Sequence, residues 1–135
     1  MSQARFSIGE LSRATGLGVE TIRYYERIGL LAPPERTAGN YRSYSIDAER
    51  RLQFVRRARG MGFTVEQVRS LLSMADRSAQ DCAAVDAMAR VHLAAVDQKI
   101  AELEALRGEL QDLIEHCNKS TIADCRIIRS LQGAR

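Results

Sequence analysis

Three cysteines are the residues of this chain whose type and spacing suggest a chemical site. Cys117 and Cys125 flank a polar stretch of seven residues, and Cys82 lies 35 residues before Cys117. Thiolates bind soft metal ions such as Hg(II), Cd(II), Pb(II) and Zn(II). An odd number of cysteines, in a chain without a signal peptide, argues against a disulfide framework. The cysteines therefore predict a metal site, and His116 is the nearest candidate for a fourth ligand.

The thiols allow other interpretations. Cys117 and Cys125 could form a reversible disulfide that senses redox conditions, or the thiols could be incidental. Cysteine is also often a small core residue. The sequence contains no Cys-x-x-Cys, phosphate-loop or HExxH motif, so we expect that the protein is not an enzyme.

The elements that must position these thiols begin with a long helix. Between Asp81 and His116 there is no proline, and Gly108 is the single glycine. A helix of about 35 residues would be roughly 52 Å long. Cys82 and Cys117, one near each end, therefore cannot meet within one chain.

Apolar residues recur along this helix with the heptad period of a coiled coil. The a positions are Cys82, Ala89, Val96, Leu103, Leu110 and Cys117, and the d positions are Val85, His92, Lys99, Leu106 and Leu113. The pattern predicts a homodimer whose interface contains Val85, Ala89, His92, Val96, Ile100, Leu103, Leu106, Leu110 and Leu113. In an antiparallel pair centred between Lys99 and Ile100, Cys82 of one subunit would reach Cys117 and Cys125 of the other. Two identical three-thiolate sites per dimer are then expected.

Positive charge is concentrated in the N-terminal half. Residues 1–70 contain 12 arginines, no lysine and 7 acidic residues, whereas residues 71–135 contain 8 basic and 10 acidic residues. Arginine is favoured for contacts with phosphate and guanine, so this asymmetry is typical of a nucleic-acid-binding protein. A purely architectural DNA-binding protein with incidental thiols, and a redox-sensing regulator, are the alternatives to a metal-responsive one. No run of about 18 apolar residues is present, so we expect a cytoplasmic protein without a membrane segment.

Two short helices joined by a glycine-containing turn are predicted near the N-terminus. Ser7 and Glu10 form a capping box for the first helix, and Gly16 ends it. The second helix begins at Val19, and Gly29 ends it. Together they form a helix-turn-helix.

A β-hairpin, or wing, is predicted over residues 32–45. Two prolines exclude a helix there, the pair Gly39-Asn40 supplies a turn, and the following tyrosines favour extended structure. We expect Asp47 to cap the next helix, over residues 48–59.

Gly60 is expected to end that helix. Thr64 and Gln67 form a second capping box, which predicts a short helix to about Met74. The polar stretch that follows separates this helix from the long one.

Four segments resemble the MerR family of metal-responsive transcription regulators. They are FSIGELSRATGLGVETIRYYERIGLL, GNYRSYS, FVRRARGMGFTVEQVRSLL and the cysteine-containing end DCRIIRSLQ. The resemblance covers essentially the whole chain and implies a mainly α fold. It implies a winged helix-turn-helix DNA-binding domain with connector helices over 1–75, a dimerisation helix over 76–117, and a metal-binding loop with a short helix over 118–135.

The resemblance also implies a function and its residues. Such regulators are dimers on promoter DNA, and binding of the effector makes them distort an overlong promoter spacer so that RNA polymerase can use it. For this chain it implies a regulator of metal-resistance genes, with Cys82 of the partner subunit, Cys117 and Cys125 as ligands of a soft divalent ion. The implied DNA-binding residues are Ser7, Thr21, Arg23, Tyr24, Tyr25, Arg36, Asn40, Tyr41 and Arg42. Tyr25 is equally a candidate for the core.

Family patterns bear on the ion. Monovalent-copper sensors resemble this chain in their two loop cysteines but have serine in place of Cys82, which favours a divalent ion. Mercury sensors usually have eight residues between the loop cysteines, and zinc sensors commonly carry further loop Cys or His residues that this chain lacks. Hg, Cd, Pb and Zn all remain open, and a copper or silver sensor is the alternative. The superoxide-sensing branch is excluded because it needs four clustered cysteines.

Overall fold

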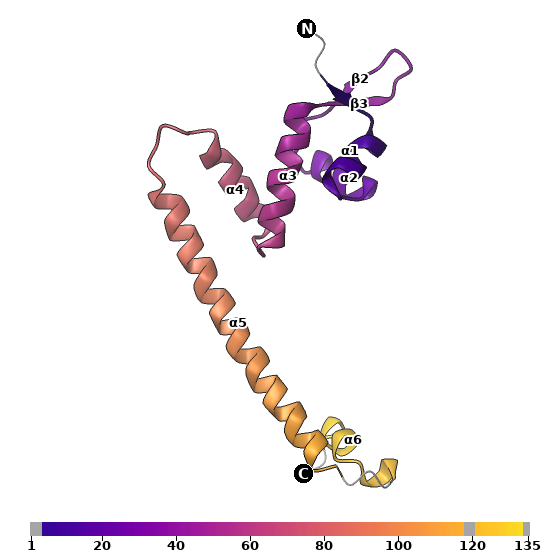
Figure 1. Cartoon of the computed structure of the whole chain (residues 1–135), viewed down its shortest axis with the longest axis vertical. Helices are drawn as coiled ribbons and strands as arrows, with labels where there is room; N and C mark the ends of the chain where they lie inside the picture. The colour runs from indigo at the N-terminus through magenta and orange to yellow at the C-terminus, as the bar shows by residue number, and fades with distance from the viewer. Residues whose placement is uncertain (1–3, 118–120, 134–135) are drawn as a thin grey trace. The chain divides into compact units, whose positions relative to one another are not determined.

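The computed structural model describes residues 4–117 and 121–133, and these are mainly helical (Figure 1). The chain divides into two compact units, Met1–Asp81 and Cys82–Arg135. The elements, in chain order, are β1 (Arg5–Phe6), α1 (Ile8–Thr15), α2 (Val19–Arg27), β2 (Glu35–Arg36), β3 (Arg42–Ser45), α3 (Ile46–Gly60), α4 (Val65–Ala75), α5 (Ala83–Glu115), the 3₁₀ turn η1 (Ile122–Asp124) and α6 (Arg126–Leu131).

The predicted helix-turn-helix is formed by α1 and α2. The Ser7 hydroxyl accepts a hydrogen bond from the Glu10 N–H at 3.1 Å, and the Glu10 carboxylate accepts one from the Ser7 N–H at 3.0 Å. Gly16 follows α1 with a φ of 75°, and Gly29 follows α2 with a φ of 82°. Both glycines occupy the left-handed region, which ends a helix at little steric cost. The capping box and both helix ends were predicted correctly.

The core of the first unit is mostly aliphatic and is built from every helix of that unit. Full burial of each large apolar side chain stabilises the fold by about 1.5–3 kcal/mol. The buried apolar side chains are Leu11, Ile22, Tyr25, Leu30, Leu31, Tyr44, Leu52, Val55, Ala58, Phe63, Val68 and Leu72. The helix-turn-helix is therefore held in place by side chains of the same chain.

The wing is part of a three-stranded antiparallel sheet with the order β1-β3-β2. The hairpin of β2 and β3 was predicted, and Glu35 pairs with Ser43 in it. Strand β1 was not predicted, because two residues are too few to show an alternating pattern. Its Phe6 pairs with Tyr44 on the other side of β3.

The start predicted for the third helix was wrong. Ser45, the last residue of β3, is the N-cap, and its hydroxyl accepts a hydrogen bond from the Ala48 N–H at 3.2 Å. Asp47 therefore lies in the first turn of α3, where its charge suits the helix dipole. The helix ends at Gly60 as expected, and the glycine in the left-handed region is Gly62, two residues later, with a φ of 92°.

Helix α4 begins as predicted. The Thr64 hydroxyl accepts a hydrogen bond from the Gln67 N–H at 3.2 Å, and the Gln67 amide oxygen accepts one from the Thr64 N–H at 2.8 Å. The helix extends to Ala75, one residue beyond the expected end.

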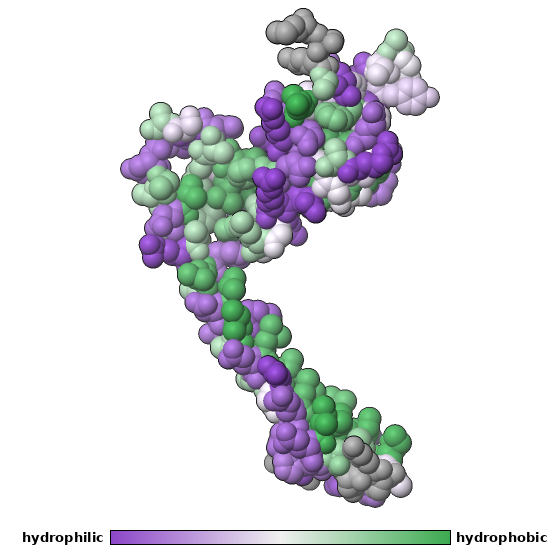
Figure 2. All heavy atoms as spheres, in the orientation of Figure 1, coloured by the Kyte–Doolittle hydropathy of each residue, from purple (hydrophilic) through white to green (hydrophobic). Residues whose placement is uncertain are grey.

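The second unit consists of the 33-residue helix α5 and the short elements that follow it. Helix α6 packs against α5 near the C-terminal end of α5 (Figure 1). No described residue of this unit is buried. Its apolar side chains form a line along α5 that is visible in Figure 2. Within the described residues, no helix has the length and apolarity that crossing a bilayer would require.

Candidate nucleic-acid interface and thiol site

The outer face of α2 exposes the side chains predicted to contact DNA. Arg23 is exposed, and its guanidinium Nη1 lies 2.8 Å from the Glu20 carboxylate. The ring of Tyr24 is also exposed, and the Arg27 guanidinium carbon lies 5.7 Å from its centre. Thr21 is half-buried on the same helix. This face can therefore offer a cation and a hydroxyl-bearing ring to a ligand.

Tyr25 does not share this exposure. Its side chain is only 6% exposed, and its backbone carbonyl accepts hydrogen bonds from the Leu30 and Leu31 N–H groups. A buried ring cannot reach DNA without unfolding part of the core. The prediction of Tyr25 as a DNA-binding residue is therefore not supported by its position, and the core alternative describes it. Ser7, also predicted to bind DNA, is exposed and uses its hydroxyl to cap α1.

The tip of the wing presents exposed side chains on a tight turn. Tyr41 is 75% exposed, and Asn40 adopts a left-handed conformation with a φ of 65°. The Arg36 guanidinium donates to the Asn40 carbonyl at 3.2 Å, and the Thr37 N–H donates to the Tyr41 carbonyl at 2.8 Å. These bonds order the turn while leaving the Tyr41 ring free of core contacts.

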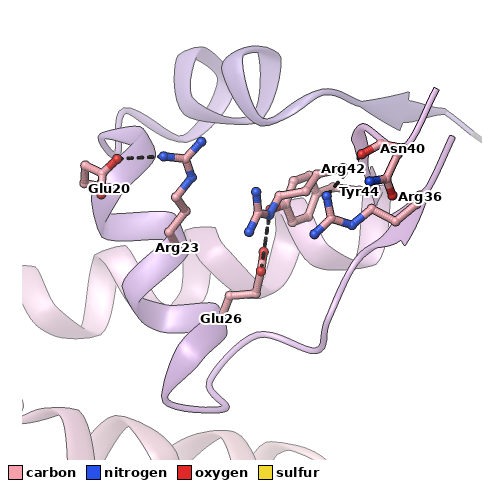
Figure 3. A network of polar contacts seen from close by, with 7 residues as sticks. All are labelled: Glu20, Arg23, Glu26, Arg36, Asn40, Arg42 and Tyr44. Carbon is pink, nitrogen blue, oxygen red and sulfur yellow. Dashed lines mark hydrogen bonds and ion pairs between the residues drawn. The ribbon is translucent and has the colours of Figure 1, made fainter.

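A carboxylate connects the base of the wing to α2 (Figure 3). The Tyr44 hydroxyl donates to one Glu26 oxygen at 2.5 Å, and Arg42 Nε lies 3.4 Å from the other. Burial of the Tyr44 ring raises the pKa of its hydroxyl well above the usual value, and the Glu26 carboxylate raises it further. The hydroxyl therefore remains protonated and donates at any physiological pH. This connection was not predicted.

Several arginines counted in the basic N-terminal half are hydrogen-bonded to backbone carbonyls. Arg69 donates to the carbonyl of Ile28, the C-cap of α2, and Arg51 donates to that of Leu30 in the turn that follows. Cations in this position stabilise a helix end. Arg59 donates in the same way to the Phe63 carbonyl at 2.9 Å. The excess of arginine therefore reflects structural contacts as well as a candidate binding surface, which residue counts cannot separate.

Cys117 and Cys125 are brought together within one chain. Cys125 immediately precedes α6, and both cysteines are half-buried. The backbone N–H of Ile128 lowers the pKa of the Cys125 thiol, with smaller contributions from the Ile127 N–H and from the Cys117 side chain. A lowered pKa favours the thiolate, the form of cysteine that binds metals. Residues 118–120, part of the predicted loop, lie outside the described residues.

Cys82 lies at the other end of α5, where it is exposed and precedes the helix. The 33 residues of α5 separate it from Cys117 by roughly 50 Å. Accordingly, no cluster of three or more His, Cys, Asp or Glu residues suited to a metal occurs among the described residues. The Nδ1 atom of His116 faces the preceding turn, 2.8 Å from the Asp112 carbonyl oxygen.

The predicted interface residues lie on an exposed part of α5. The exposed fractions of seven large apolar side chains are between 37% and 57%; these are Val85, Val96, Ile100, Leu103, Leu106, Leu110 and Ile114. Ala89 is exposed as well, whereas His92 and Leu113 are half-buried. The exposed apolar line leaves a large surface in contact with water unless another helix covers it.

Comparison with known proteins gives matches over nearly the whole chain. The family model described as MerR HTH family regulatory protein matches residues 6–75, and the model described as MerR, DNA binding, matches residues 49–113. The Heavy metal-dependent transcription regulator 2 of Rhizobium meliloti is 39% identical over 125 residues, which cover 93% of this chain and 85% of that protein.

Two solved structures with bound metals are also similar. The transcription regulator PbrR691 from Ralstonia metallidurans, in complex with lead(II), is 40% identical, with a TM-score of 0.77 and coverage of 93% of this chain and 98% of that one. The dual-function regulator MerR from Bacillus megaterium, in complex with mercury(II), is 34% identical, with a TM-score of 0.65 and coverage of 94% and 99%.

Proposed function

Because this chain belongs to the MerR family of transcription regulators, which are not enzymes, we propose that it is a metal-responsive homodimer that binds promoter DNA. In this proposal residues 1–75 bind DNA, residues 76–117 dimerise, and residues 118–135 hold the metal loop. The observation that carries it is the approach of Cys117 to Cys125 while Cys82 stays at the far end of α5.

The proposed DNA contacts come from two elements that protrude from one folded core. Helix α2 would enter the major groove with Arg23 and Tyr24, supported by Thr21. The wing would contact the phosphate backbone through Tyr41 and Arg42, and also through Arg36 and Asn40 at its turn. Phosphate contacts of this kind set the register of a protein on the duplex but carry little sequence information.

The proposed metal site is shared between subunits. One chain supplies two thiols near the start of α6, and the missing third thiol would come from Cys82 of the partner subunit. One antiparallel pairing of two α5 helices would do both things. It would cover the exposed apolar line, and it would place Cys82 of one subunit beside Cys117 and Cys125 of the other. Coverage of apolar area stabilises association by about 25 cal/mol per Å² before the costs of ordering.

We propose a soft divalent ion as the effector. The similar regulators carry lead(II) and mercury(II) in their solved structures, and both ions accept thiolate ligands readily. Cadmium and zinc favour four ligands more strongly. A monovalent copper or silver ion remains the alternative, because it would need only the two thiols that one chain supplies.

A redox switch is the second candidate function, and the same approach of Cys117 to Cys125 favours it. Two neighbouring thiols, one with a lowered pKa, are suited to reversible disulfide formation. Such a switch would need neither Cys82 nor a partner subunit. The role of Cys82 therefore distinguishes the two functions.

Subunit mixing tests the shared site. A Cys82→Ser chain is combined with a Cys117→Ser, Cys125→Ser chain, and Cd(II) binding is followed by thiolate-to-metal absorption. Neither homodimer contains a complete three-thiolate site, whereas the mixed dimer should contain one. Absence of any regained site would contradict the shared arrangement.

Reporter induction then tests the function itself. A panel of Zn, Cd, Pb, Hg, Cu and Ag salts is applied to cells carrying the protein and its own promoter. Cys117→Ser should abolish induction and retain DNA binding. Induction by oxidant, unchanged in a Cys82→Ser chain, would instead support the redox switch.

A further inference from the structure

Glu26 connects the two elements that carry the proposed DNA contacts. It belongs to α2, and its carboxylate oxygens are occupied by Tyr44 and Arg42, both of β3 (Figure 3). Its side chain is only 14% exposed, and the Tyr44 ring is 1% exposed. An ionised group this far removed from water is costly unless it is paired, so the arrangement has little freedom to vary.

The same contact orients Arg42. Its Nε atom faces Glu26 at 3.4 Å, which leaves the two terminal nitrogens of the guanidinium as the donors that remain for a ligand. The positive charges of Arg42 and Arg23 both act on the Tyr44 hydroxyl, so both guanidinium groups lie near the junction of helix and wing. Figure 3 shows the side chains of Arg23, Arg42 and Arg36 extending into the space between α2 and the wing.

We propose that Glu26 is a positioning residue for DNA binding, which ties the wing to α2 so that Arg42 reaches the phosphate backbone in a set register while Arg23 reaches the major groove. This inference rests on the proposed function, since it assumes that α2 and the wing contact one duplex. Glu26 itself would not touch DNA. Its role is to order a long side chain before binding, which reduces the entropy cost of the complex.

A simpler electrostatic view predicts the opposite result. A carboxylate beside a phosphate-binding surface repels DNA, so its neutralisation should tighten binding. Glu20 offers a matched comparison on the same helix, because it pairs with Arg23 but its side chain is 86% exposed and it has no described contact with the wing. Glu20→Gln and Glu26→Gln each remove one negative charge, and only Glu26→Gln weakens the tie to the wing.

The experiment measures the affinity of the full-length dimer for its own promoter duplex by fluorescence anisotropy at several salt concentrations. Glu26→Gln should weaken binding about tenfold, the scale of one charge-assisted hydrogen bond, while Glu20→Gln should leave the affinity unchanged or improve it. In an Arg42→Ala background, Glu26→Gln should cost less affinity than in the unmodified protein, because only the contact with Tyr44 is then left to weaken. A loss of affinity caused by general unfolding would be the same in both backgrounds.

Thermal unfolding shows whether each variant is folded. If Glu26→Gln does not fold, Tyr44→Phe replaces it, since that change removes the hydroxyl donor and keeps the charge of Glu26; a smaller loss of affinity is then expected. If Glu26→Gln, or Tyr44→Phe in its place, binds DNA as tightly as the unmodified protein, the inference about Glu26 is overturned. The proposed function is not affected by that result. Failure of the unmodified protein to bind promoter DNA would overturn the proposed function and this inference together.

Discussion

The two units of the chain bury their apolar residues in different ways. In Met1–Asp81, side chains such as Leu11, Leu52 and Val68 are fully enclosed by neighbours from the same chain. In Cys82–Arg135, side chains such as Leu103 remain about half exposed, and no described residue is buried.

This difference shows which functions one chain can complete alone. The first unit can hold its binding surface rigid as a monomer, because its core, sheet and helix caps are internal. The second unit gathers two thiols but leaves an apolar line uncovered and the third thiol distant. In the proposed function, metal sensing therefore depends on assembly of the dimer, whereas the shape of the candidate DNA-binding surface does not.

The largest expected effect is on assembly. Leu103→Asp would place two charges in the proposed dimer interface, one from each subunit, and should weaken dimerisation by more than about 1,000-fold. Sedimentation equilibrium measures the dissociation constant. Glu104→Gln, at the next position of α5, is the control and should leave it nearly unchanged. A Leu103→Asp protein that stays dimeric at micromolar concentration would show that α5 does not form the interface.

A core truncation tests the independence of the first unit. Leu52→Ala removes a fully buried side chain and should lower the free energy of unfolding by about 2–5 kcal/mol. Urea denaturation followed by tyrosine fluorescence measures the loss. For the first unit this loss should be the same at every protein concentration. A loss that grew with dilution would show that the core of this unit depends on the dimer.

A helix cap gives a smaller effect within the same unit. Thr64→Ala removes the hydroxyl that accepts from the Gln67 N–H and should cost about 1 kcal/mol of unfolding free energy. Ser73→Ala, an exposed change inside α4, should alter stability by only a few tenths of a kcal/mol. Equal losses in the two variants would mean that the capping box does not stabilise α4.

The smallest effect concerns the thiol pair. The pKa of Cys125 is lowered in the folded chain, so its thiolate forms at lower pH than in the denatured chain. Alkylation of Cys125 by iodoacetamide should therefore reach half its maximal rate at a lower pH in the folded chain than in the denatured chain. Below the folded-state pKa the thiol is protonated and the advantage disappears. Peptide mapping by mass spectrometry follows Cys125 separately. A midpoint at the same or a higher pH would contradict the local arrangement at α6.

Most of the secondary structure followed from patterns within a few residues. The capping boxes at Ser7 and Thr64, the glycine ends at Gly16 and Gly29, and the long helix between the cysteines were all evident from residue type and spacing. The start of α3 was less evident, because Ser45 and Asp47 are both good caps, and the strand that ends at Ser45 decides between them.

The features of the candidate site also fall into two groups, those that local sequence patterns predict and those that they do not. Sequence identified the cysteines, the exposed Arg23 and Tyr24, and the wing, because each lies in a recognisable local motif. It could not place Tyr25 in the core, assign Arg51 and Arg69 to the end of α2 and the turn that follows, or find the contact of Glu26 with Tyr44.

The amino-acid sequence by itself therefore determined the family, most of the helices, the capping boxes at Ser7 and Thr64, and the wing. The helices, the capping boxes and the wing depend on interactions within one helical turn or one hairpin. Only the tertiary structure decided which tyrosine is buried, which arginines are available for a ligand and how the wing is tied to α2. Those outcomes depend on contacts between residues that are 16 to 41 positions apart, and no local pattern specifies which of several similar side chains will make them.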